Sequence, residues 1–133
     1  MSSAAMRAVV YARFSSHGQS EQSIEGQLRD CHAFAEREGY SIVHEYIDRA
    51  KSARSDNRPR FQDMIKDAAK KQFQVIIVWK LDRFARNRYD SAIYKARLKK
   101  HGVTVLSVME RLTDSPEGII LEGMLESMAE FYS

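Results

Sequence analysis

The sequence contains one cysteine, Cys31, among its 133 residues, so it cannot form an internal disulfide. Its four histidines are scattered along the chain, which disfavours a structural zinc site. No apolar run approaches the roughly 20 residues that span a bilayer. The N-terminal segment from Met1 to Met6 also lacks the charged and apolar regions of a secretory signal. These absences lead us to expect a cytoplasmic protein without a metal site.

The chain has the length and the apolar content of one compact domain. Its apolar share of 44% exceeds that of disordered chains. The net charge of +3 comes from 21 basic and 18 acidic residues, which are unevenly distributed. Basic residues dominate at 49–60 and 80–100, and acidic residues dominate after residue 109. This asymmetry suggests a polyanion on one side of the domain, although solvated helix faces are the simpler explanation of charge alone.

Short apolar runs alternate with helical patterns along the chain. The patterns predict strands at 8–11, 41–47, 75–79 and 103–108, and helices at 20–38, 60–71 and 88–101. The run at 75–79 is apolar throughout, which is typical of a central strand buried on both faces. Segment 48–59 is charged and without periodicity, so we expect a loop there. The alternation predicts an α/β fold, a three-layer sandwich with a mainly parallel central sheet.

A long C-terminal helix is expected to begin at Ser115-Pro116, which suits an N-cap followed by a first-turn proline. The pattern is still helical at the last residue, Ser133. Its apolar residues cover more than one narrow stripe. Such a helix can pack on a partner chain or on sequence beyond this segment. It can also cover the sheet of its own domain, and both explanations stay open.

In parallel sheets, sites form outside the carboxyl ends of the strands. The rule selects the loops after Tyr11, after Ile47 and after Trp79, which hold the densest arginines of the sequence. The three clusters there are Tyr11-Ala-Arg13-Phe-Ser15-Ser16 with Gln19, then Arg58-Pro-Arg60, and finally Leu81-Asp82-Arg83-Phe-Ala-Arg86. We therefore expect these arginines and serines to meet at one edge of the sheet.

A hydroxyl among several arginines suits displacement at a phosphodiester. Serine is a weak nucleophile until its proton is removed or its product charge is stabilised. Guanidinium groups can hold the charge that develops on the phosphate oxygens, and several can crowd one site because arginine stays protonated. Metal-dependent transfer would need clustered carboxylates or a glycine-rich loop, whereas Asp82 is the one acid of its cluster. The pattern predicts metal-free attack on a phosphate, with no cofactor.

Each of these residues also has a simpler structural explanation. Ser15 and Ser16 could lead into the first helix, and Arg13 could pair with a surface carboxylate. Asp82 could form a structural ion pair with a neighbouring arginine. A non-catalytic module that binds phosphate-bearing ligands or partner proteins therefore stays open, as does a phosphohydrolase with a transient phosphoserine. The clustered arginines favour catalysis over binding alone, and the basic middle of the chain favours DNA over a small ester.

The opening motif, from Tyr11 to Ser16 with Gln19 after it, resembles that of the serine recombinases, the resolvase–invertase and phage-integrase family. The segment from Leu81 to Arg86 resembles the second motif of the family, and Asp56-Asn-Arg58-Pro matches its loop arginine. The resemblance covers nearly the whole chain and implies one catalytic, resolvase-like domain at 1–133, cut off within the C-terminal helix. The Tyr132-Ser133 ending is similar to that of the large serine recombinases and leaves the role of Tyr132 open.

The resemblance implies a role for each site residue. Ser15 is expected to be the nucleophile, Gln19 a nearby hydrogen-bonding group and Asp82 an orienting carboxylate. The arginines expected to bind the scissile phosphate are Arg13, Arg58, Arg83 and Arg86. The residues expected to contact DNA beside them are Ser16, Arg54, Arg60 and Arg88.

Members of this family cut duplex DNA through a 5′-phosphoserine bond, and four subunits rejoin the ends after half of the complex rotates. The resemblance therefore implies integration, excision or inversion at DNA attachment sites, without ATP. It also implies a dimer and a synaptic tetramer assembled through the C-terminal helix, in a protein of bacterial, phage or mobile-element origin. Because the catalytic groups of the family are spread apart before synapsis, we expect poorly arranged loops around Ser15 and Arg58.

Overall fold

The computed structural model of the chain describes residues 6–15, 23–50, 58–85 and 88–110, together with residues 124 and 127. Within these residues, four strands form one parallel sheet in the order β2-β1-β3-β4. Their bounds are Met6–Ser15 for β1, Tyr40–Ala50 for β2, Val75–Val78 for β3 and Thr104–Ser107 for β4. The α/β class and the parallel sheet are confirmed. The expected C-terminal helix lies outside the described residues, except that Met124 and Ser127 are helical.

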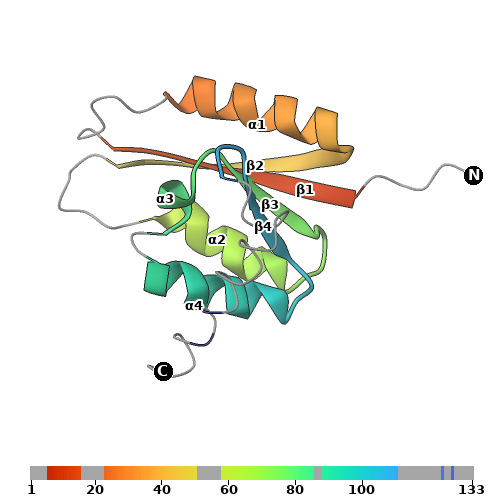
Figure 1. The fold of residues 1–133 in the computed structure, drawn as a ribbon, viewed down its shortest axis with the longest axis vertical. Helices are drawn as coiled ribbons and strands as arrows, with labels where there is room; N and C mark the ends of the chain where they lie inside the picture. Colours follow the sequence, from red (N-terminus) through yellow and green to blue (C-terminus); the bar gives the residue numbers. More distant parts are fainter. Residues whose placement is uncertain are drawn as a thin grey trace, which may run out of the picture.

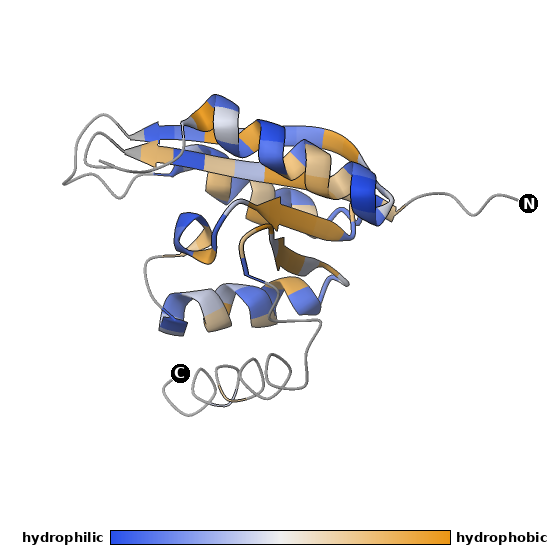
Figure 2. Ribbon diagram, turned by 45° about the horizontal axis from the view of Figure 1, so that its top comes forward, coloured by the Kyte–Doolittle hydropathy of each residue, from blue (hydrophilic) through white to orange (hydrophobic). Residues whose placement is uncertain are grey.

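Helices cover both faces of the sheet, so the fold has three layers (Figure 1). Helix α1 (Ile24–Glu38) lies on one face, and α2 (Pro59–Ala68) and α4 (Arg88–Lys99) lie on the other. Each face has its own core, because successive residues of a strand point to opposite sides. Val9 and Tyr11 pack on the α2 side, whereas Ala8 and Val10 pack on the α1 side. Strand β3 is buried throughout, as its apolar run predicts, and it is orange in the hydropathy colouring (Figure 2).

The ends of α1 follow from local sequence chemistry. Ser23 is the N-cap, and its Oγ accepts a hydrogen bond of 3.1 Å from the Gly26 N–H. Gly39 ends the helix with φ at 84°, in the left-handed region, and its N–H donates to carbonyls of the last turn. Glycine adopts this conformation without a steric penalty, which explains why the helix ends at this residue.

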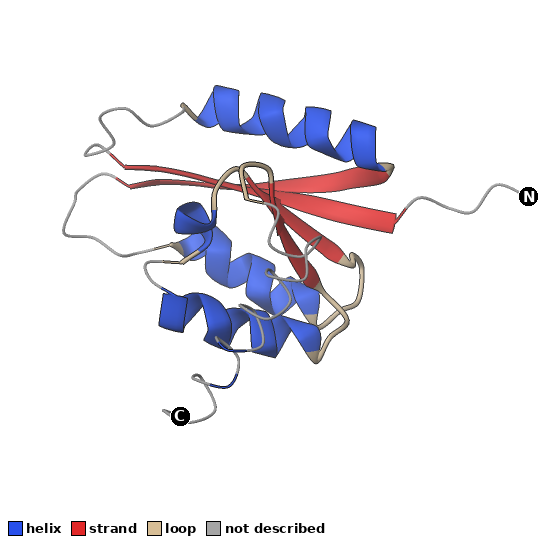
Figure 3. Ribbon diagram, in the orientation of Figure 1, coloured by secondary structure: helices blue, strands red, loops and turns tan. Residues whose placement is uncertain are grey.

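Two strands continue farther than the sequence predicts. β1 pairs with β3 only from Ala8 to Tyr11, whereas its pairing with β2 runs from Met6 to Ser15. Residues 12–15 and 47–50 therefore extend past β3 as a two-stranded ribbon (Figure 3). The prediction of a loop from residue 48 was wrong, because β1 supplies ladder hydrogen bonds that override the polar composition of 48–50.

A short helix that the sequence reading did not predict follows β3. Helix α3 (Leu81–Phe84) comes within a few residues of the strand and lies beside the ribbon (Figure 1). It contributes Phe84, which is fully buried, to the core on the α2 side. The turn that carries Asp82 and Arg83 is thus anchored in the protein interior at the carboxyl end of the sheet.

Candidate active site

Guanidinium groups from two other segments of the chain converge on α3. An Nη2 atom of Arg13, on the ribbon, donates a hydrogen bond of 3.0 Å to the Asp82 carbonyl. The Nη1 atom of Arg58, before α2, donates a hydrogen bond of 2.7 Å to the Phe84 carbonyl. Arg13, Arg58 and α3, one part of each predicted cluster, therefore meet at the carboxyl-end rim of the sheet.

Arg13 is held by its backbone as well as by its side chain. The Gln27 amide oxygen accepts from the Arg13 N–H over 3.3 Å, and the Gln27 Nε2 donates to the Arg13 carbonyl over 3.0 Å. Gln27 comes from α1 and is fully buried. Its amide group makes the two hydrogen bonds that a neighbouring strand would make with the backbone of Arg13. This happens just past Tyr11, where the pairing between β1 and β3 ends. The buried Nε of Arg13 meets no hydrogen-bond acceptor among the described residues.

Arg58 lies flat against the aromatic core. Its guanidinium carbon is 3.7 Å from the centroid of the Phe61 ring and 5.9 Å from that of the Tyr11 ring. Stacking on an aromatic face attracts the cation electrostatically and restricts its orientation. Arg58 is half-buried, so part of this residue is accessible from the surface beside α3.

Asp82 and Arg83 form an ion pair within α3. The Arg83 Nη1 is 2.8 Å from Oδ1 of Asp82, and the Arg83 side chain is only 4% exposed, against 59% for Asp82. The Arg83 guanidinium carbon also lies 5.4 Å from the centroid of the Trp79 ring. Arg83 therefore faces the protein interior in this structure, whereas the Asp82 carboxylate faces solvent.

The sequence reading missed Asp48, which organises the start of α2. This residue is 5% exposed, and its two oxygens accept from the Arg60 N–H at 3.1 Å and the Phe61 N–H at 3.0 Å. The Tyr11 hydroxyl donates to Oδ2 of the same carboxylate over 2.8 Å. Arg58 provides no side-chain cap of its own, so Asp48 fixes the helix that carries this arginine.

Burial affects the protonation of two groups, the Tyr11 hydroxyl near the rim and the Cys31 thiol in the core on the α1 side. It raises the pKa of the Tyr11 hydroxyl well above its usual range, and the adjacent Arg58 guanidinium opposes this rise. Tyr11 is therefore a neutral hydrogen-bond donor to Asp48 at physiological pH. Burial likewise raises the pKa of the Cys31 thiol to about 12, so this thiol stays protonated and unreactive.

Several predicted residues fall outside the described part of the chain, namely Ser16, Gln19, Arg54 and Arg86. Ser15 is the last residue of β1, where its backbone pairs with that of Ala50. The Arg60 guanidinium is 3.2 Å from Asp63 and does not join the other arginines. Arg88 begins α4 and is exposed. The expected poor arrangement of the loops concerns residues mainly outside the described ranges.

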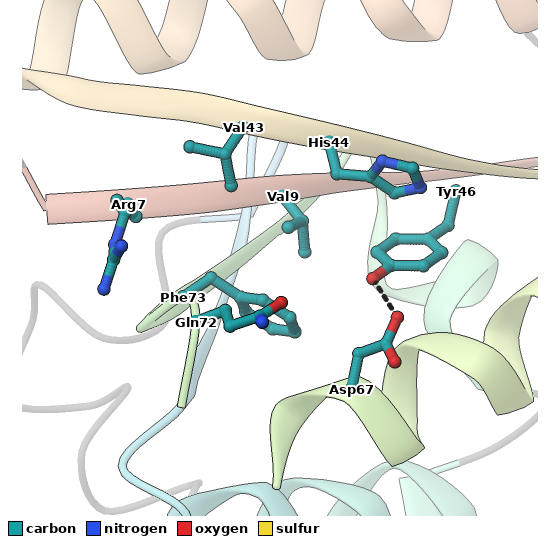
Figure 4. A pocket seen from close by; sticks show the side chains of 8 residues that line it. All are labelled: Arg7, Val9, Val43, His44, Tyr46, Asp67, Gln72 and Phe73. Carbon is teal, nitrogen blue, oxygen red and sulfur yellow. Dashed lines mark hydrogen bonds between the residues drawn. The ribbon is translucent and has the colours of Figure 1, made fainter. Parts of the chain in front are cut away.

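A separate hollow of about 420 Å³ lies between β2 and the end of α2 (Figure 4). Its wall includes Arg7 at the amino end of β1, and His44 and Tyr46 on β2. The Tyr46 hydroxyl donates a hydrogen bond of 2.7 Å to Oδ2 of Asp67 across the hollow. None of the convergent arginines lines it, so the hollow is distinct from the site at the rim.

The described residues hold no group of three or more His, Cys, Asp or Glu side chains that could bind a metal ion. In the same part of the chain, no helix is both long and apolar enough to cross a bilayer. What the rim offers is two half-buried guanidinium groups, those of Arg13 and Arg58, that donate to neighbouring carbonyls of α3. Such a set suits an anion with several oxygens, such as a phosphate group.

Comparisons with known proteins agree with this geometry. The chain is 28% identical to the N-terminal catalytic domain of TP901-1 integrase, with a TM-score of 0.78 and 95% of each chain covered. It is 30% identical to a resolvase family site-specific recombinase from Streptococcus pneumoniae, with a TM-score of 0.77, and covers 87% of that chain.

A curated protein of Bacillus subtilis (strain 168), named "Putative DNA recombinase", is 27% identical over 124 residues. The match covers 92% of this chain but 24% of that protein, so the chain spans about a quarter of its length. The family model "Resolvase, N terminal domain" matches residues 8–133. The chain therefore belongs to the resolvase family of serine recombinases, within which it corresponds to the N-terminal catalytic domain.

Proposed function

We propose that the chain cleaves and rejoins duplex DNA through a covalent bond between Ser15 and a 5′-phosphate. The observation that carries the proposal is the convergence of Arg13 and Arg58 on the α3 turn, at 3.0 and 2.7 Å from its carbonyl oxygens. Ser15 ends the strand that carries Arg13. A phosphate bound by these guanidinium groups therefore lies at the end of the segment that supplies the hydroxyl.

In the proposed reaction, the Ser15 hydroxyl loses its proton as its oxygen attacks phosphorus. The bond to the 3′ oxygen breaks, and that oxygen takes up one proton and leaves as a 3′-hydroxyl, so no net proton is gained or lost. The attacked phosphate gains negative charge on its non-bridging oxygens, which the arginines stabilise. Arg13 and Arg58 are half-buried and each donates one hydrogen bond to α3, so we assign the first contact with the phosphate to them. The phosphoserine bond keeps the energy of the broken diester, so a 3′-hydroxyl can reverse the step without ATP.

The remaining residues have supporting roles in this proposal. Asp82 orients the Arg83 guanidinium through their ion pair at 2.8 Å. Arg83 is buried in the structure, so its direct contact with phosphate requires a shift of α3. Arg86 and Gln19 complete the phosphate site, and the residues that contact DNA beside it are Ser16, Arg54, Arg60 and Arg88.

The proposal extends to the assembly and the outcome of the reaction. The proposed catalytic domain spans residues 1–133 and includes the C-terminal helix expected after Ser115. Through this helix the protein forms a dimer and then a synaptic tetramer on two DNA attachment sites. The result is integration, excision or inversion of DNA by a cytoplasmic enzyme of the large serine recombinase type.

Trapping the covalent adduct tests the proposal. The full-length protein is incubated with a nicked duplex that lets the cleaved end diffuse away, and the modified residue is mapped by mass spectrometry. We expect phosphate-linked DNA on Ser15, no adduct with Ser15→Ala, and a normal adduct with the control Ser41→Ala on β2. An adduct that persists in Ser15→Ala contradicts the proposal.

The same protein samples separate the two other candidate functions. A phosphate-binding module binds DNA and forms no adduct in any variant. A phosphohydrolase releases inorganic phosphate from a small phosphate ester, and this release stops with Ser15→Ala. Either result removes strand transfer as the function of the rim.

A further inference from the structure

The first turn of α3 is held by a carboxylate that follows strand β4. Leu81 begins α3, and its N–H donates a hydrogen bond of 2.7 Å to Oε1 of Glu110. The Ser107 hydroxyl donates to the same oxygen over 2.8 Å. In return, the Ser107 Oγ accepts from the Glu110 N–H over 3.2 Å. Ser107 and Glu110 thus form a small reciprocal unit that caps α3 from outside.

α3 has little else to hold its N-terminus. It contains four residues, and its N-cap residue, Lys80, makes no side-chain capping hydrogen bond. A helix of one turn fixes several dihedral angles for few internal hydrogen bonds and is not stable alone. Its first N–H groups also need acceptors from elsewhere. Because Glu110 supplies such an acceptor, it determines where α3 begins.

The orientation of α3 in turn affects three guanidinium groups. Arg83 is part of α3, and Arg13 and Arg58 donate hydrogen bonds to the Asp82 and Phe84 carbonyls. A rotation of the turn would move the two carbonyls and so reorient both side chains. The capping carboxylate therefore acts on the arginines through the backbone of α3.

We propose that Glu110 is a positioning residue for DNA strand transfer: its acceptor oxygen orients α3, and through α3 it orients the arginines that bind the phosphate. This inference rests on the proposed function of the rim. Glu110 itself contacts neither the phosphate nor Ser15 in the proposed reaction. Its contribution is geometric, so it affects the rate of cleavage more than the affinity for DNA.

The hydrogen-bond pattern provides a conservative variant. Both donors reach the same oxygen of Glu110, so the amide oxygen of Glu110→Gln can accept both hydrogen bonds. Glu110→Ala removes the acceptor. We expect Glu110→Ala to slow adduct formation at saturating DNA by about 10- to 100-fold. A displacement of catalytic groups by about 1 Å has an effect of this size. Glu110→Gln should stay within about threefold of the parent rate, and neither variant should change DNA affinity by more than about threefold.

The single tryptophan reports the position of α3 independently of catalysis. Trp79 lies shortly before α3, its carbonyl oxygen is 3.3 Å from the Ser107 Oγ, and its ring lies beside Arg83. We expect Glu110→Ala to change the Trp79 emission spectrum of the folded protein, and Glu110→Gln to preserve it. Glu36→Ala, on the exposed side of α1, serves as the matched control and should change neither emission nor rate.

Two outcomes overturn the inference: a Glu110→Ala variant that cleaves as fast as Glu36→Ala, or a Glu110→Gln variant as slow as Glu110→Ala. If Glu110→Ala does not fold, Ser107→Ala removes the second half of the cap and should give an intermediate loss of rate. Failure of the proposed function is recognised separately, by an adduct in Ser15→Ala. In that case the emission spectra still decide whether Glu110 positions α3.

Discussion

The Tyr11 hydroxyl donates a hydrogen bond of 2.8 Å to Oδ2 of Asp48, which also accepts from the Phe61 N–H of α2. One carboxylate thereby joins β1, β2 and α2 at the rim of the sheet. Pro59 occupies the first position of α2 and has no N–H, and the next two N–H groups both donate to Asp48. Asp48 therefore satisfies the start of α2, and its charge interacts favourably with the positive end of the helix dipole.

Replacing Asp48 by alanine should lower the free energy of unfolding by about 3 kcal/mol. Loss of a helix cap costs about 1 kcal/mol, and a buried Tyr11 hydroxyl left without its acceptor costs about 1–3 kcal/mol more. Urea unfolding at pH 7 measures the change.

Asp63→Ala is the matched control for this prediction. It removes a carboxylate from α2 itself. That carboxylate pairs with the Arg60 guanidinium at the surface, over 3.2 Å. Exposed pairs contribute less than about 1 kcal/mol. Equal losses for the two variants would show that Asp48 has no special role at the start of α2.

The layers and the parallel sheet could be predicted because they follow from short-range patterns. The apolar run predicted at 75–79 needs burial on both faces, and it forms the buried strand β3. The strand conformation of residues 48–50 could not be predicted, because it depends on hydrogen bonds to β1 rather than on the composition of this segment. α3 depends similarly on Glu110, which is distant in sequence.

Arginine clusters at the ends of strands were sufficient to predict that the segments carrying Arg13 and Arg58 approach α3 at the rim. The sequence reading did not find Gln27, Asp48 or Glu110, which hold the backbone around those arginines. Each of them acts through hydrogen bonds between distant segments, as between Gln27 and Arg13. Polar residues in helices and loops are common, so nothing local distinguishes these three before the fold is known. Their contacts appear only in three dimensions.

Gly39→Ala should destabilise the protein by about 1 kcal/mol, the cost of a side chain in the left-handed conformation. The φ angle of Gly39 is 84°, and an added Cβ would meet no atom within 4 Å, so backbone strain alone sets the cost. The difference in urea midpoints, converted with the measured slope, gives the value. The neighbouring exposed Glu38→Ala should be nearly neutral, and an equally neutral Gly39→Ala would show that the end of α1 relaxes.

The Tyr46–Asp67 pair should make stability depend on acid pH. The hydrogen bond from the Tyr46 hydroxyl is the main cause that lowers the pKa of Asp67. A carboxylate whose folded pKa is lowered stabilises the protein above its unfolded pKa, about 3.9, and this contribution is lost as the pH falls through the folded pKa. Wild type should therefore exceed Asp67→Asn in stability at pH 5–7, by less than about 1 kcal/mol because the side chain is 30% exposed.

Urea unfolding at intervals from pH 7 to pH 3 tests this behaviour. The difference between wild type and Asp67→Asn should narrow as the pH falls below about 4. In a Tyr46→Phe background, the same substitution should lose most of its pH dependence, because the hydroxyl donor is absent. A difference that is unchanged across the whole range, or that widens in acid, would contradict the assigned cause.

Arg58→Lys should separate charge from geometry at the proposed phosphate site. The guanidinium of Arg58 donates to the Phe84 carbonyl over 2.7 Å and stacks on Phe61 at 3.7 Å, which leaves further N–H groups for a phosphate. A lysine ammonium keeps the charge but lacks the planar fork that binds two oxygens at once. We expect adduct formation to fall about 100-fold or more, in line with the loss of one fixed donor to an oxyanion. DNA binding at low salt should change little, since the charge that attracts the phosphate backbone remains.

Arg37→Lys on α1 is the control, because its guanidinium faces Phe34 and Glu38 far from the rim. If Arg58→Lys cleaves at the rate of this control, a positive charge suffices at position 58, and the fixed orientation of its guanidinium has no part in the reaction.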